Sequence, residues 1–560
     1  MQTVLVLGVL ALATVAVARA TRGAPASRAV AMAALCLASA GSAVVLAARA
    51  PEPALPRGIP RESGAGGYVT SRACLGCHPG EHASFSRTYH RTMTQVASPG
   101  TVLAPFERRG DDVWHDGRRV LLTTGSHREQ AYWAAGERPG ELELLPVVWM
   151  VREAVLVPRE EAFLTPPEAP LARTHWAGNC IACHAVAGQP RRADGGDAFD
   201  TRVAELGIAC ESCHGPGAAH VGRHRDPVER YMQHASKAPD PTIVQPARVA
   251  PERSAAICGQ CHAYSYPRDE QEWWSHGYAR TFRAGDALEP SRHLLGPAAL
   301  GRPEAPRIDA DVDALFWDDG SIRVGGREYN GLVASPCYER GQGERKLTCL
   351  SCHTMHAGDP AGQLAPDRQG DRACTSCHAM PREHSHHREG SPGAACTSCH
   401  MPRTSYALLS AVRSHRIDSP SVDATVRFGK PNACNLCHLD RTLSWTRARL
   451  AEWYGLTSND VPAVRARTPE GVYGALAGDA AVRVLVADAL GSAEARAAVA
   501  AGFAGPVLTP LASDPYAAVR FVARRSLERA PPGGATIALD PELVKTLLAA
   551  RDHRAITIAE

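Results

Sequence analysis

The sequence predicts a mostly α and irregular fold with small β-hairpin or sheet insertions, an all-α C-terminal domain and two apolar helices at the N-terminus. Length is the first reason, because 560 residues exceed one ordinary core and require several domains. Composition is the second, since charged residues are 21% and hydrophobic residues 44%, which excludes general disorder. The third is that aromatic side chains are few (9 Phe, 9 Trp and 13 Tyr), whereas there are 18 Cys and 24 His.

The cysteines follow a single repeated pattern. Sixteen of the 18 form C-x-x-C pairs, and a histidine follows each pair directly. The eight motifs comprise Cys74, Cys77 and His78; Cys180, Cys183 and His184; Cys210, Cys213 and His214; Cys258, Cys261 and His262; Cys349, Cys352 and His353; Cys374, Cys377 and His378; Cys396, Cys399 and His400; and Cys434, Cys437 and His438.

C-x-x-C-H is the attachment signature of c-type haem. Two thiols three residues apart reach the two vinyl groups on one porphyrin edge, and the adjacent histidine gives its imidazole to the iron. A disulfide framework needs no histidine after every pair, a zinc ribbon has no fixed following histidine, and a thioredoxin-like motif would occur once. The sequence therefore predicts eight covalently attached haem c groups.

The N-terminus predicts a membrane anchor. Residues 3–18 and 29–48 are apolar, and the second run is long enough to span a bilayer. Arg19, Arg22 and Arg28 lie between them, which places this loop in the cytoplasm and the haem motifs in the periplasm. The alternative is a cleaved signal peptide and an exported soluble periplasmic or extracellular protein.

The remaining chain divides into a linker and two domains. Residues 51–67 are rich in Pro and Gly and form the linker, residues 68–446 carry all eight motifs, and residues 447–560 carry none. Within the motif region, 119–124 and 141–157 read as strands and 315–326 as a hairpin around an Asp-Gly turn. Beyond it, 443–453 is helical by periodicity, and 478–491 and 513–530 share a pattern that resembles HEAT-type helical repeats. Where motifs lie close together, we expect the haems themselves to form the core.

The charge distribution bears on partners. The formal net charge is +3, with no basic stripe that would indicate nucleic-acid binding. Beyond residue 50 the acidic side chains exceed the basic ones by one, and haem propionates add further negative charge. We therefore expect redox protein partners in or at the membrane to present a basic or neutral surface, within a larger complex or oligomer.

Sixteen histidines lie outside the motifs, enough for a second axial ligand on every iron. Bis-histidine ligation closes the iron and favours electron transfer, whereas an iron without a sixth ligand could bind substrate. The leading distal candidates are His90, His220, His356 and His415. His175 and one member of the His384–His387 cluster, for which we take His387, come next.

Several stretches resemble the multihaem (octahaem) c-type cytochromes with doubled C-x-x-C-H motifs, in the superfamily of hydroxylamine oxidoreductase and the nitrifier tetrahaem cytochrome. They are residues 68–93, 123–133, 207–220, 335–356, 396–409, 414–417 and 431–446. The resemblance implies a stacked, mostly bis-histidine haem chain. By position it supports His90, His220, His356 and His415 as distal ligands, and it adds His127 beside His175. The sequence offers no counterpart for the haem-crosslinking tyrosine of that oxidoreductase, so the resemblance fixes no reaction.

Three functions remain open at the level of sequence. The favoured one is a membrane-anchored periplasmic electron carrier that passes electrons along its haems. The second is a haem oxidoreductase acting on a nitrogen or sulfur oxyanion of the nitrite, hydroxylamine or tetrathionate type at one open iron. The third is a structural subunit that docks a larger electron-transport complex through its tail. Whether the protein is an enzyme is undecided, and the sequence indicates no catalytic residue.

Overall fold

The computed structural model describes residues 58–557, except for 170–172, 194, 197, 297–311, 324, 326, 408 and 531–538. The chain separates into two units, residues 1–57 and 58–560. Both predicted N-terminal helices lie outside the described residues. Within the described ranges, no helix combines the length and the apolar character needed to cross a bilayer.

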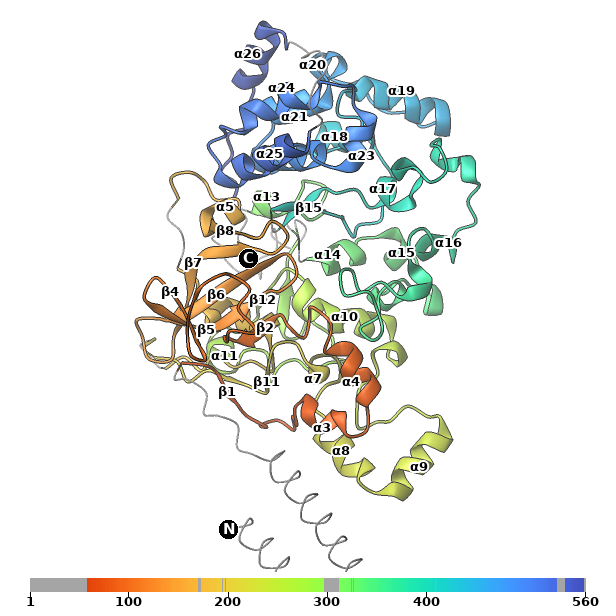
Figure 1. Ribbon diagram of the computed structural model, residues 1–560. Coiled ribbons are helices and arrows are strands. Elements are labelled where there is room, and N and C mark those ends of the chain that lie inside the picture. Colours follow the sequence, from red (N-terminus) through yellow and green to blue (C-terminus); the bar gives the residue numbers. More distant parts are fainter. Residues whose placement is uncertain are drawn as a thin grey trace, which may run out of the picture. The chain divides into compact units, whose positions relative to one another are not determined.

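A seven-stranded sheet fills the long interval between the first two motifs (Figure 1). Antiparallel pairing gives the order β3-β4-β5-β6-β7-β8, and β2 pairs with β5. The strands are β2 (Thr94–Val96), β3 (Glu107–Arg109), β4 (Asp112–His115), β5 (Arg118–Thr124), β6 (Glu129–Ala135), β7 (Leu142–Met150) and β8 (Val155–Pro158). Trp133 packs with Leu122 in one cluster and Tyr132 packs with Val120 in another. Successive side chains of β6 point to opposite faces, and the register of β5 shifts between Val120 and Leu122. The predicted strand at 119–124 is confirmed, whereas 141–157 is two strands rather than one.

The other strands form two-stranded sheets in the segments around the motifs. They are β1 (Arg61–Glu62) with β10 (Arg202–Val203), β9 (Ala185–Val186) with β11 (Glu205–Leu206), β12 (Ser265–Pro267) with β13 (Arg292–Leu294) and β14 (Ser405–Ala407) with β15 (Ser410–Val412). At the predicted hairpin of 315–326, the described residues form only an isolated bridge between Phe316 and Ile322.

Helices in the motif region are short. They are α3 (Ser71–Leu75), α4 (Pro79–Phe85), α5 (Arg159–Ala162), α6 (Ile181–His184), α7 (Cys210–His214), α8 (Ala218–His224), α9 (Pro227–Ser236), α10 (Pro251–His262), α11 (Glu270–His276), α13 (Val312–Leu315), α14 (Glu328–Val333), α15 (Pro336–Glu339), α16 (Arg372–Thr375), α17 (Cys396–His400) and α18 (Val422–Phe428). Between residues 348 and 403, which the structure describes throughout, no hydrophobic side chain is buried. This segment carries three motifs and has no apolar core of its own.

The C-terminal helices pack into a layer of their own (Figure 1). They are α19 (Leu443–Tyr454), α20 (Ala463–Arg467), α21 (Glu470–Ala477), α22 (Ala480–Leu490), α23 (Ala493–Ala498), α24 (Ala504–Leu511), α25 (Ala517–Arg529) and α26 (Pro541–Ala549). The helices predicted at 443–453, 478–491 and 513–530 are confirmed as α19, α22 and α25. One hydrophobic cluster joins Val484 and Val519 of these helices to Val148 of β7 and Val157 of β8.

Candidate functional site

Each C-x-x-C-H motif forms about one helical turn. In four of them the backbone N–H of the histidine donates to the backbone carbonyl of the first cysteine, four residues earlier, at 2.9–3.0 Å. These histidines are His78, His353, His378 and His438. Residues four apart on a helical turn lie on the same side. The local backbone therefore presents two thiols and one imidazole together, as covalent haem attachment requires.

Six motif histidines each face the imidazole of a histidine outside the motifs. The ring centroids are 6.2–6.4 Å apart in the pairs His78–His220, His262–His90, His214–His356, His353–His415, His400–His384 and His438–His387. Two imidazoles bound through Nε2 to one metal, with metal–nitrogen bonds of about 2 Å, have centroids roughly 6 Å apart. The spacing in all six pairs is therefore what one iron between two imidazoles requires.

The other ring nitrogen of several of these histidines has a fixed partner. Nδ1 lies 2.8–2.9 Å from a backbone carbonyl in His214 (Val244), His353 (Gly362) and His400 (Asp418). An imidazole that donates from Nδ1 holds the tautomer in which Nε2 is free to bind a metal. The residues present thus fit a haem iron on the Nε2 side.

Two of the pairs have a carboxylate as this partner. His262 Nδ1 lies 2.7 Å from Glu328 Oε2, and His220 Nδ1 lies 3.0 Å from Asp240 Oδ2. Burial alone would lower the pKa of His262, but the hydrogen bond and charge of Glu328 raise it to about 9. Asp240 also accepts from His224, so His220, His224 and Asp240 form a cluster with metal-ligand chemistry. Because His220 faces His78, we interpret Asp240 and His224 as residues that hold His220 in place rather than as a separate metal site.

Burial dominates the electrostatics of two other imidazoles, His90 and His184. It lowers the pKa of His90 to about 4, and the neighbouring His262 and His353 add to the effect. It also lowers the pKa of His184 to about 4, with a further contribution from Arg327. Neutral imidazole is the form that binds a metal. These side chains are therefore held in the ligand form at neutral pH.

Some predicted ligands lie elsewhere. His127 stacks on Tyr89 with centroids 4.1 Å apart, and His175 Nδ1 lies 2.9 Å from Glu141, so neither is paired with a motif histidine. All 24 histidines are in described residues, and none stands at the pairing distance from His184 or His378. Conversely, the sequence predicted one distal ligand in the 384–387 cluster, His387, whereas the structure pairs both His384 and His387 with motif histidines. The three histidines between the sixth and seventh motifs were the signal for the second ligand.

Interactions between motif cysteines order the motifs in space. Counting motifs along the chain, hydrogen-bonded thiols join the first to the third (Cys74–Cys210), the fourth to the fifth (Cys258–Cys349) and the sixth to the seventh (Cys374–Cys396). Thiols near enough to interact electrostatically join the third to the fourth (Cys213–Cys258), the fifth to the sixth (Cys352–Cys374) and the seventh to the eighth (Cys399–Cys434). The second motif joins the fourth, where Cys183 Sγ lies 3.8 Å from the Cys261 carbonyl oxygen. The motifs therefore form a continuous series with one branch.

Comparisons with known proteins agree with this arrangement. Residues 342–383 match the family described as "Doubled CXXCH motif", and residues 164–215 match "Cytochrome c554 and c-prime". The chain is a multihaem c-type cytochrome. Its motifs bind haem c covalently, and electron transfer is the function that these matches support.

A solved structure supports the fold. The chain resembles the "Crystal Structure of Outer Cell Wall Cytochrome OcwA" with a TM-score of 0.50 and 17% identity, over 83% of this chain and 100% of that chain. At this identity the likeness concerns the fold alone. No curated protein matches the chain.

The carboxylate of Glu328 is expected to lower the reduction potential of the haem held by Cys258, Cys261 and His262, because negative charge beside the imidazole stabilises the oxidised iron. Glu328→Gln should raise that potential by on the order of 60 mV, a tenfold change in a one-electron equilibrium. Redox titration monitored by EPR measures this shift. The matched control is Glu339→Gln, which removes an exposed carboxylate. A titration unchanged by Glu328→Gln would contradict the assignment.

Proposed function

We propose that this cytochrome is an octahaem electron carrier of the hydroxylamine oxidoreductase superfamily, with six of its eight irons ligated by two histidines. The observation that carries the proposal is the continuous series of motifs from Cys74 to Cys434. Haem c, when bound, supplies a one-electron centre whose potential depends on its axial ligands and surroundings. A series of neighbouring attachment sites gives electrons a path through the protein without a diffusing carrier.

The paired imidazoles support closed, electron-transferring irons. The distal residues assigned are His90, His220, His356, His384, His387 and His415. In every pair except His384–His400 the two histidines are more than about 50 residues apart, so these pairs also fix long-range contacts. His127 and His175 have other partners and are not assigned to an iron.

The distal assignment is tested by two neighbouring residues. His387 faces His438, whereas His386 stacks on Trp453 with centroids 4.7 Å apart. His387→Ala should convert one of eight haems from low-spin to high-spin, and His386→Ala should leave the EPR spectrum of the oxidised protein unchanged. A pyridine haemochrome assay should give eight haems per chain in both variants. Equal spectra for the two variants, or fewer haems in wild type, would contradict the assignment.

We further propose that residues 1–50 anchor the protein in the cytoplasmic membrane, with the haem domain in the periplasm. The acid-free apolar runs and the arginines between them support this. The resemblance to a cytochrome described as being of the outer cell wall agrees with export.

Fractionation of cells that express the full chain tests the anchor. The protein should stay in the membrane pellet after an alkaline carbonate wash, whereas a version with a cleavable signal peptide in place of residues 1–50 should be released with the periplasmic fraction. Release of the full chain in a shortened form would favour a cleaved signal.

We propose that the C-terminal helices are HEAT-like repeats that dock the carrier in a larger electron-transport complex. Arg483 of α22 donates to both carboxylate oxygens of Asp514, just before α25, at 2.7 and 3.0 Å. The two side chains are 3% and 1% exposed, so the pair lies inside the layer. Arg483 belongs to the first predicted repeat, 478–491, and Asp514 to the second, 513–530, and a contact from one repeat to the next is typical of stacked repeats. Cross-linking of the native membrane tests the docking, which requires links from residues 447–560 to a partner.

One observation favours an alternative function, a haem oxidoreductase for a nitrogen or sulfur oxyanion. His184 belongs to the branch of the series, and no described imidazole faces it at the pairing distance. It lies half-buried beside Thr94, with Nδ1 3.2 Å from the hydroxyl oxygen, and Arg327 contributes positive charge nearby. An iron held there would have no described imidazole as its sixth ligand and could take one from solution, and the guanidinium would favour an anion.

EPR of the oxidised protein with and without nitrite or hydroxylamine separates the two functions. A carrier gives no turnover, and its low-spin signals do not respond to either molecule. The enzyme predicts a high-spin signal that disappears on ligand binding, together with turnover under a strong reductant or oxidant. His378 is exposed, so its iron is the second candidate for such a signal.

A further inference from the structure

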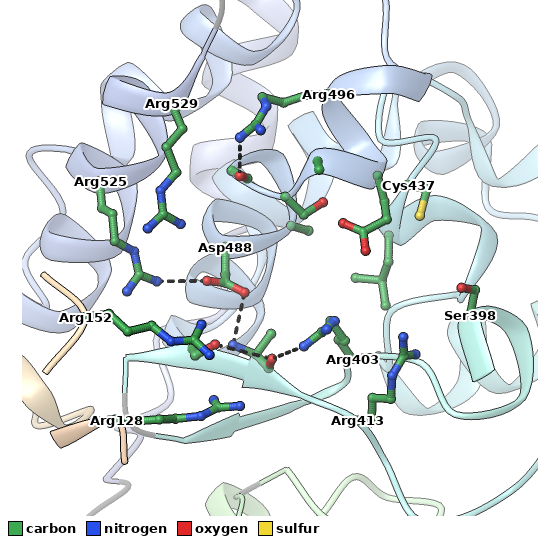
Figure 2. Close-up of a pocket in the computed structure, with 18 of the residues that line it drawn as sticks. Arg128, Arg152, Ser398, Arg403, Arg413, Cys437, Asp488, Arg496, Arg525 and Arg529 are labelled. Carbon is green, nitrogen blue, oxygen red and sulfur yellow. Dashed lines mark hydrogen bonds and ion pairs between the residues drawn. The ribbon is translucent and has the colours of Figure 1, made fainter. Parts of the chain in front are cut away.

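An arginine-lined cavity of about 450 Å³ lies beside the last two motifs (Figure 2). Its walls come from the loops around β6 and β7, from β15 with its flanking residues, from α17 and the 434–437 turn, and from α22, α23 and α25. Its volume falls within the range of about 300–1,000 Å³ for small-molecule sites. Seven arginines and three carboxylates line it, a formal surplus of four positive charges.

Only two of the seven guanidiniums are paired with carboxylates. Arg525 contacts Asp488 at 2.9 Å and Glu153 at 3.3 Å, and Arg529 lies 3.8 Å from Glu153. Figure 2 shows Asp488 turned toward Arg525, where its other oxygen accepts from the Ala411 N–H at 3.1 Å. These acids are therefore already engaged and do not neutralise the rest of the cavity.

The other five arginines have no carboxylate within ion-pair distance among the described residues. Arg403, Arg413 and Arg496 donate only to backbone carbonyls, at 2.6–3.2 Å. Arg128 and Arg152 extend side by side into the cavity in Figure 2, and their guanidinium groups have no hydrogen-bond partner in the described structure. Burial, followed by the charge of Arg152 and Arg403, lowers the pKa of Arg128. Like charges gathered in this way repel one another, and an anion between them would remove that repulsion.

The cavity adjoins the cysteine side of the eighth motif and not its imidazole. None of the imidazoles of His384, His387, His400 or His438 lines it. The two motifs contribute Ser398, Leu436 and Cys437, which belong to the side where thioethers hold the vinyl edge of a haem. The propionates are on the opposite edge of the porphyrin, so we do not assign the arginines to them.

We propose that this cavity binds a small soluble polyanion, a molecule with at least two carboxylate or phosphate groups. The volume exceeds what a single oxyanion fills, and a surplus of four charges matches a ligand of several negative charges. Guanidiniums suit both groups because they donate in a planar fork that fits two oxygens. Glu494, which has no ion-pair partner among the described residues, is the one acid that opposes such a ligand.

Calorimetric titration of the full-length holoprotein at low ionic strength, with citrate and pyrophosphate as probes and chloride as reference, tests the proposal. Saturable binding of at least one probe is expected, and it should weaken as salt is added because the attraction is electrostatic. Arg128→Gln and Arg152→Gln should each weaken it about tenfold, since each removes a charge-assisted hydrogen bond. Glu494→Gln should strengthen it.

The matched control is Arg524→Gln, because Arg524 lies beside Arg525 on α25 but is exposed and does not line the cavity. It should leave the affinity unchanged. Absorption spectra and melting curves establish that each variant is folded and loaded with haem. Absence of saturable binding in the wild type, or equal affinity in wild type and both cavity variants, overturns the proposal. So does a shift in haem potential in Arg128→Gln without any probe binding, because that result would assign the arginines to haem propionates.

Discussion

The structure depends on imidazole pairs that bridge distant parts of the chain at the spacing of one metal ion. His78 meets His220, His214 meets His356, and His90 meets His262, so each pair closes a loop of more than a hundred residues. Closing such loops costs conformational entropy. Residues 348–403 bury no hydrophobic side chain that would offset this cost. We therefore expect metal–ligand bonds and the apolar porphyrin to be the stabilising terms there, with folding coupled to haem attachment.

The imidazole pairs differ in the group that accepts a hydrogen bond from Nδ1. Backbone carbonyls at His214, His353 and His400 accept a hydrogen bond without adding a full charge. Glu328 and Asp240 add a negative charge beside His262 and His220. A carboxylate partner makes the imidazole a more basic ligand and favours the oxidised metal. Sites with identical motifs can therefore differ in potential through side chains that lie outside the motifs.

A feature could be predicted from the sequence when the residues that form it lie close together in the chain. The motifs are local, because two thiols and an imidazole within five residues already define the attachment chemistry. The distal ligands are not local, and the resemblance that supported His220, which faces His78, also added His127, which stacks on Tyr89. Strand periodicity located 119–124 correctly but read 141–157 as one strand, because the turn at Arg152–Ala154 carries no glycine or proline. Ala154 adopts a positive φ of 51° at that turn. Glu328 carries no sequence signal, since it is 66 residues from the histidine it contacts.

The order of the motifs in space bears on the path that electrons take and on the function of the protein. The first motif lies near the N-terminal end of the described residues, and the eighth adjoins the C-terminal helices, so the series runs from the chain's N-terminal side to its C-terminal layer. The second motif is joined to the fourth alone, and a site on a branch adds nothing to passage along the series. A branch is useful where electrons are stored or delivered to a bound molecule, and His184, without an imidazole opposite, belongs to that branch. The same topology therefore fits a carrier that stores an electron at the branch, and it fits an enzyme that receives electrons from its own haem series. The coordination of the iron at His184 distinguishes the two.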